Sequence, residues 1–150
     1  MGTGYFGKII ERHNKVNAHL KAKRHTNRIV LIDDFADQGG KVMHSSTNIL
    51  TSLFVRGRHL GCACWLLTQK LRVVSLICRT NFCWMIIWRL RNSKELITIL
   101  EELDALVDRK LLNEMYRIAT SEKHSFWYIN LLNEQDQMFF KNFEHRFAIN

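Results

Sequence analysis

The sequence predicts an α/β fold in which a mostly parallel sheet is flanked by helices. Strand-like apolar runs alternate along the chain with segments of helical periodicity, which is the order typical of parallel sheets. The first run, Ile29 to Ile32, is apolar without alternation, as in strands covered on both faces. The 150 residues suffice for one core, and no proline, linker or repeat divides them, so we expect a single domain over residues 1–150.

Each helix or strand is predicted from the periodicity of its apolar residues, from β-favouring residues or from a capping residue. Gly61 is expected to end the first helical unit, and Ser93 is a plausible N-cap for a later helix. The aromatic tail after residue 131 receives no assignment. The expected elements are, in order, a loosely helical segment at 5–24, a strand at 29–32, a helix at 46–58, strands at 62–67 and 82–88, helices at 93–107 and 109–119, and a strand at 125–131.

Composition excludes several classes of protein. Hydrophobic residues make up 47% of the chain, so it is neither disordered nor fibrous. No apolar run approaches the roughly 18 residues of a membrane span, and the N-terminal residues lack the apolar core of a signal peptide. We expect a soluble protein of the cytosol or nucleus.

The four cysteines have a spacing that fits zinc ribbons poorly. They follow a C-x-C, then a C-x4-C pattern, whereas zinc ribbons favour C-x2-C pairs. We interpret them as buried, reduced thiols, and a metal site stays an alternative. The cysteines are Cys62, Cys64, Cys78 and Cys83.

Charge is distributed unevenly along the chain, whose net charge is +8. Residues 38–94 hold nine Lys or Arg and no acid, whereas residues 95–150 hold ten acids and six basic residues. A basic first two-thirds indicates a polyanion partner, either nucleic acid or nucleotide phosphate. The alternative is a solvated surface balanced by another subunit.

Two acids follow directly after the first apolar strand. In parallel sheets the ligand sits at the carboxyl ends of the strands, which singles out Asp33, Asp34 and Gln69. Carboxylates at the end of an apolar strand are costly unless they are paired, and Mg²⁺ prefers one or two of them together with phosphates. A turn or a helix N-cap would explain the same pair.

Neighbouring motifs carry a resemblance to a known superfamily. The string VLIDDFAD (Val30 to Asp37) resembles the Walker B segment of the FtsK–HerA P-loop ATPases. LFVRGRHLGCACWLLTQ (Leu53 to Gln69), with its Gly-Arg-His motif and terminal Gln, resembles the genome-packaging ATPases of large eukaryotic DNA viruses, the poxvirus-like type. Arg79-Thr80-Asn81 resembles the Arg-x-Asn of that group, and the likeness spans about residues 28–103.

The resemblance implies a RecA-like fold and a role for each matching residue. Asp33 would hold Mg²⁺ through water, Asp34 would polarise the attacking water, and Gln69 would act as the sensor of the γ-phosphate of ATP. Arg79 is the candidate trans-acting arginine, with Arg56 and Arg58 as alternatives. His59 is expected to be structural, bonding the following loop, and Asn81 to be a turn residue.

The phosphate-binding loop of that superfamily is where the sequence departs from the pattern. Gly2 to Lys8 matches the first seven positions of G-x4-G-K-[ST], but Ile9 stands where the hydroxyl that binds Mg²⁺ is required. Too few residues separate Lys8 from Asp33 for the usual helix and strand. We therefore expect only the later half of a RecA-like packaging core, incomplete at its N-terminal side and poorly self-sufficient.

The resemblance implies a subunit or fragment of an ATP-driven translocase that moves double-stranded DNA into capsids. Its partners would be duplex DNA, a ring of identical chains or a complementing chain with a Walker A loop, and a capsid portal vertex or a membrane, in the virion or a viral factory. No small-molecule metabolite is implied. The alternatives are a non-enzymatic DNA-binding or assembly protein, an inactive remnant, and a metal nuclease, for which the acid-free stretch supplies no further carboxylates.

Overall fold

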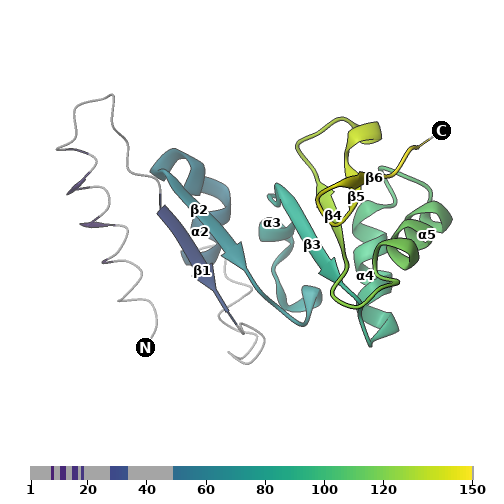
Figure 1. Cartoon of the computed structure of the whole chain (residues 1–150). Helices are drawn as coiled ribbons and strands as arrows, with labels where there is room; N and C mark the ends of the chain where they lie inside the picture. The colour runs from purple at the N-terminus through teal and green to yellow at the C-terminus, as the bar shows by residue number, and fades with distance from the viewer. Residues whose placement is uncertain are drawn as a thin grey trace. The chain divides into compact units, whose positions relative to one another are not determined.

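The computed structural model describes residues 8, 11–12, 15–16, 18, 28–33 and 49–149. The chain forms two compact units, Met1–Asn81 and Phe82–Asn150 (Figure 1). Each unit has its own sheet and its own core. The expectation of a single RecA-like domain stays a prediction.

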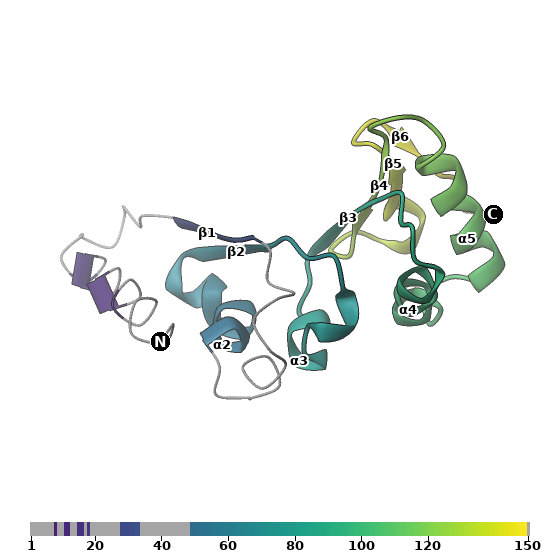
Figure 2. The ribbon, with the colours of Figure 1, turned by 90° about the horizontal axis from the view of Figure 1, so that it is seen from below.

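Unit 1 is built on two parallel strands. β1 (Arg28–Ile32) pairs with β2 (Cys62–Leu66), and α2 (Ile49–Arg56) lies on one side of them (Figure 2). Strands that run in parallel need a crossover, and α2 provides one, as the sequence predicts. The core of this unit is formed by buried side chains from α2, β2 and the segment after β2: Leu50, Leu53, Cys62, Leu71, Val74 and Cys78.

Two glycines shape the connection from α2 to β2. A 3₁₀ turn, Gly57–Leu60, follows α2, and a Cβ on Gly57 would lie 2.6 Å from the backbone oxygen of Cys62. Gly61 has a φ of 63°, in the left-handed region that favours glycine. The prediction that Gly61 ends the helical unit is therefore confirmed.

The second face of the β1–β2 sheet exposes apolar side chains. Ile29 is 66% exposed, Leu31 60%, and Trp65 and Leu67 are each 42% exposed. The register pairs Leu31 with Trp65, so these side chains share one face, while Val30, Cys64 and Leu66 alternate to the other. Within the part of the chain that the structure describes, this parallel pair is covered on one face, although parallel sheets are usually covered on both.

Unit 2 is an antiparallel sheet with two helices on one side (Figure 2). Its core joins the inward side chains of β4 and β5 to those of the two helices, with Trp127 stacked on Phe139 at a ring distance of 5.7 Å. Its elements are β3 (Trp84–Trp88), α4 (Ser93–Leu103), α5 (Arg109–Ala119), β4 (Phe126–Asn130), β5 (Phe139–Lys141) and β6 (His145–Arg146).

The expected direction of the sheet holds for unit 1 alone. β3 and β4 fall where strands are predicted, but they pair antiparallel, and β5 and β6 continue the sheet in the same sense. The unassigned tail thus supplies two strands. Among the described residues the fold is α/β with one small parallel and one larger antiparallel sheet, so a mostly parallel sheet is not observed.

The predicted helices of unit 2 are present with corrected ends. The helix expected at 93–107 ends at Leu103, while the one expected at 109–119 is confirmed. Asn92, not Ser93, is the N-cap of α4, and its side-chain oxygen accepts from the backbone N–H of Lys94 at 2.9 Å. No helix among the described residues is long and apolar enough to cross a membrane.

Candidate active site at the carboxyl ends of β1 and β2

The register of the parallel pair brings two predicted residues to one edge. Ile32 pairs with Leu66, and the N–H of Leu67 donates to the oxygen of Ile32 at 2.9 Å. Asp33 therefore leaves β1 where β2 also ends, and Gln69 follows two residues after Leu67. Both side chains are exposed. The carboxyl ends of β1 and β2 therefore lie at one edge of the sheet, and the roles predicted for Asp33 and Gln69 at this edge stay predictions.

A side-chain turn fixes the backbone around Gln69. The hydroxyl of Thr68 accepts from the N–H of Lys70 at 3.1 Å and lies 3.2 Å from the Lys70 oxygen. This bonding bends the chain directly after β2 and leaves Gln69 at the bend. A short turn of this kind holds a terminal amide near the strand end while its tip stays free to reach a ligand.

The oxygen atoms at this edge suit Mg²⁺. The described residues contain no group of three or more His, Cys, Asp or Glu that could hold an ion by itself. Proteins commonly hold Mg²⁺ by one or two carboxylates together with nucleotide phosphates and water, and a role of Asp33 in such a site stays a prediction. Asp34, the predicted water-polarising residue, lies outside the described residues.

Two of the candidate arginines belong to the opposite edge of the sheet. Arg56 is the last residue of α2 and is exposed, and the side chain of Arg58, in the following turn, lies outside the described part. Both precede β2, whose five residues span about 16 Å. Arg56 therefore lies at the other end of β2 from Asp33, so a role of Arg56 at the carboxyl edge would have to be played toward another subunit.

Arg79 ends a short helix that packs against α2. This helix, α3 (Leu76–Arg79), has Ser75 as its N-cap, and the thiol of Cys78 lies 3.8 Å from the hydroxyl of Thr51 on α2. Arg79 is half-buried, with its Nε shielded from solvent. The side-chain amide of Asn81 donates to the oxygen of Ile77 at 2.8 Å, which confirms Asn81 as a turn residue.

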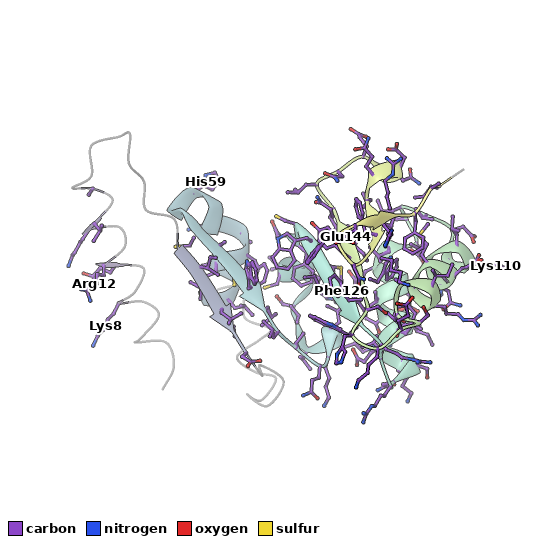
Figure 3. All side chains as sticks on the ribbon, viewed as in Figure 1. Lys8, Arg12, His59, Lys110, Phe126 and Glu144 are labelled. Atoms are coloured by element: carbon purple, nitrogen blue, oxygen red, sulfur yellow. The ribbon has the colours of Figure 1, made fainter. Side chains whose placement is uncertain are left out.

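His59 does not make the expected structural bond within the described residues. Its side chain is exposed at the end of unit 1 where β2 begins (Figure 3), and it has no hydrogen bond to a described residue. In the Gly-Arg-His motif the clear structural requirement is instead the absence of a side chain at Gly57. At the start of the chain, Lys8 is helical and exposed, while Gly2 to Gly7 and Ile9 lie outside the described residues.

The thiols differ in accessibility. Cys62 and Cys78 are buried and Cys64 is half-buried, but Cys83 is exposed, which corrects the expectation of four buried thiols. Burial raises the pKa of Cys64 to about 12, with smaller contributions from Cys78 and Cys62. At neutral pH Cys64 is therefore a neutral thiol that is a poor nucleophile and metal ligand.

Sequence reasoning missed the segment between β2 and β3. Residues 70–81 read as a short basic connection, yet they form a 3₁₀ turn at Leu71–Val73 and then α3. The available signal was Ser75, whose hydroxyl accepts from the N–H of Cys78 three residues on, as an N-cap does. This segment positions Arg79.

The comparison with known protein families concerns most of the chain. The family model described as the poxvirus A32 protein matches residues 6–146. The chain belongs to the poxvirus A32 protein family. This is a family of viral genome-packaging ATPases, and the match includes both units and the edge that carries Asp33 and Gln69. No curated protein and no solved structure matches the chain.

Membership of the poxvirus A32 family agrees with the packaging-ATPase resemblance, and it suggests ATP and Mg²⁺ as cofactors. The roles of individual residues rest on the geometry described above. That geometry brings Asp33 and Gln69 to one edge and leaves Arg56 and His59 beyond the other end of β2.

Proposed function

We propose that this chain contributes the strand-end half of an ATP-hydrolysing site in a motor that packages double-stranded viral DNA. The observation that carries the proposal is the parallel register of β1 and β2, which puts Asp33 and the Gln69 turn at one edge. A carboxylate and an amide on adjacent strand ends are the groups that P-loop ATPases use for Mg²⁺ and for positioning water. Membership of a packaging ATPase family supports the same reaction.

The residues would divide the chemistry as follows. Asp33 would hold the water shell of Mg²⁺, which when bound neutralises charge on the β- and γ-phosphates. Asp34 would accept a hydrogen bond from the attacking water, and Gln69 would donate to the γ-phosphate or to that water. An arginine from a neighbouring chain, with Arg79 as first candidate and Arg56 or Arg58 as alternatives, would stabilise charge in the transition state.

A phosphate loop with the hydroxyl that binds Mg²⁺ would have to lie outside residues 2–9, because Ile9 takes the place of that hydroxyl in the pattern that starts at Gly2. The partners would be a complementing chain with a Walker A loop or identical chains arranged in a ring. Such an assembly would stand at a capsid portal vertex, or at a membrane, and act on duplex DNA. The second candidate, a non-enzymatic DNA-binding protein, is favoured by the acid-free stretch over residues 38–94.

ATP hydrolysis tests the carboxylate pair, with a Walker A-bearing half supplied. We expect Asp34→Asn to reduce turnover at least a hundredfold with ATP still bound, because an amide is a far weaker base for the water. Asp33→Asn should weaken the dependence on Mg²⁺, and Gln69→Ala should slow turnover with little change in ATP affinity. The readouts are steady-state ATPase activity and ATP affinity measured by titration calorimetry.

Asp104→Asn is the matched control, since Asp104 is an exposed acid directly after the last residue of α4 in unit 2. It should leave both readouts unchanged. Near-normal turnover in Asp34→Asn would remove the catalytic role from the pair. If this chain binds DNA but does not hydrolyse ATP with any Walker A-bearing half, the result would favour the non-enzymatic DNA-binding protein instead.

A further inference from the structure

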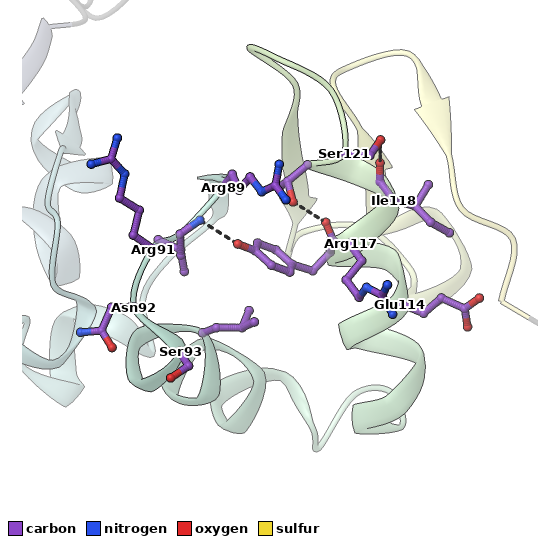
Figure 4. Close-up of a pocket in the computed structure, with 12 residues that line it drawn as sticks. Arg89, Arg91, Asn92, Ser93, Glu114, Arg117, Ile118 and Ser121 are labelled. Carbon is purple, nitrogen blue, oxygen red and sulfur yellow. Dashed lines mark hydrogen bonds between the residues drawn. The ribbon is translucent and has the colours of Figure 1, made fainter.

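Unit 2 carries an open pocket that is remote in sequence from the carboxylate pair. It has a volume of about 760 Å³ and is bounded by the segment that joins β3 to α4 on one side and by α5 on the other (Figure 4). The hydroxyl of Tyr116 accepts from the backbone N–H of Leu90 at 2.7 Å and links the two walls.

Three arginines line the pocket. Arg89 and Arg91 lie in the segment after β3 and Arg117 on α5, and all three side chains are exposed. In the part of the chain that the structure describes, none of them has an ion-pair partner. Folding therefore brings Arg89 and Arg91, near the end of the acid-free stretch, to the same pocket as Arg117 from the acidic last third of the chain.

The other groups in the pocket also favour an anion, with one exception. The N-terminus of α4, with Asn92 and Ser93, opens onto it, and the positive end of the helix dipole lies there. Ser121 adds a polar wall. Glu114 is the single acid of the lining, so three cations face one carboxylate.

The form of the pocket indicates what kind of anion fits. Sites for small ligands enclose most of the ligand between apolar walls. This one is open, its lining is polar and apolar in about equal measure, and its three guanidinium groups are exposed, with Arg89 and Arg91 on one wall and Arg117 on the other (Figure 4). Guanidinium groups that lie apart in this way suit successive phosphates along a nucleic-acid backbone better than a single enclosed anion.

We propose that Arg89, Arg91 and Arg117 bind backbone phosphates of double-stranded DNA across this pocket. The proposal deepens the proposed function, on which its choice of duplex DNA rests, by naming where the duplex is held. It involves unit 2 and no residue of the carboxylate pair. Contacts of this type are independent of base sequence and release one condensed counterion or slightly less per phosphate.

Fluorescence anisotropy tests the site, with the full chain and a short fluorescein-labelled duplex, in the absence of nucleotide. Affinity should be measured from roughly 50 to 200 mM salt, and each arginine changed to alanine should lower the slope of log K against log salt by about 1. The fold-decrease in affinity between roughly 50 and 200 mM salt should then be about three- to fourfold smaller in each alanine variant than in the unmodified chain. Arg→Lys at the same positions keeps the charge and should keep most of the slope.

Arg109→Ala is the matched control, because Arg109 is also on α5 but pairs with Glu101 at 3.6 Å outside the pocket. It should leave the slope unchanged, and Glu114→Gln should tighten binding. Absence of DNA binding by the unmodified chain, or a slope in all three alanine variants equal to that of the unmodified chain, would overturn the proposal. Displacement of DNA by equimolar inorganic phosphate would also overturn it, since the pocket would then be a site for free phosphate.

The DNA-binding assay and the ATPase assay test the two proposals independently, so either proposal can fail without the other. An inactive carboxylate pair does not alter binding measured without nucleotide. Loss of the salt slope in the arginine variants, with an unchanged circular dichroism spectrum, reports on the pocket alone.

Discussion

At the scale of the residue, Cys64 should make the folded state less stable as pH rises into the alkaline range. Burial raises its pKa to about 12 from an ordinary value of 9.0, so the unfolded chain loses the thiol proton first. This contribution to stability is complete below pH 9 and is lost as pH rises toward 12. Cys64→Ser should flatten that decline, measured as urea unfolding at several pH values, and Cys83→Ser should not.

The Gly-Arg-His motif shows what a resemblance can assign and what it cannot. The sequence marks Gly57 as part of a family motif, and only the structure shows that a side chain there would meet the backbone of Cys62. Close approach between segments that are distant along the chain leaves no periodic signal. The exposure of His59 was unpredictable for the same reason.

At the scale of the element, the bond between Tyr116 and Leu90 holds α5 against the segment that precedes α4. Tyr116→Phe removes the acceptor of a part-buried backbone N–H and should cost about 1–3 kcal/mol of unfolding free energy. The measurement is urea denaturation followed by circular dichroism. Tyr128→Phe is the control, because its hydroxyl has no hydrogen bond within the described residues, and a similar loss there would contradict the assignment.

Sequence patterns located most elements but not the direction of the sheet in unit 2. Apolar periodicity marks where strands and helices lie, and β1 to β4, α2, α4 and α5 were all predicted near their positions. The direction of β4 relative to β3 depends on how α4 and α5 return the chain to the sheet. The alternation of inward and outward side chains along a strand is the same in parallel and antiparallel pairs, so it does not predict this direction. β5 and β6 are too short for a reliable signal.

The candidate site was predictable to the extent that it follows from chain order. Asp33 and Gln69 were expected at one edge because the carboxyl ends of parallel strands meet there, and the register agrees. The arginine pocket was not predictable, because Arg117 joins Arg89 and Arg91 only through packing of α5. Whether Arg79 serves a neighbouring chain stays a prediction.

At the scale of the whole molecule, the face of β1 and β2 that no described residue covers should bind an apolar dye. Leu31, Ile29 and Trp65 expose an apolar surface that water solvates poorly. The native chain should increase the fluorescence of ANS, and Ile29→Thr with Leu31→Thr should reduce that signal. Leu132→Thr, a change at a singly exposed leucine in a loop of unit 2, is the control. Equal signals in all variants would mean that this face is covered in solution.

The contrast between one accessible thiol and three shielded ones has a practical consequence for single-molecule work. Maleimide at neutral pH should attach to Cys83, at the beginning of unit 2, well before it reaches Cys62, Cys64 or Cys78. The oxygen of Cys83 accepts from the N–H of Leu131 at 2.9 Å, which anchors the attachment point to the sheet. A donor dye there and an acceptor on a DNA duplex would allow the proposed movement of DNA past unit 2 to be tested by energy transfer, with no cysteine introduced by mutagenesis.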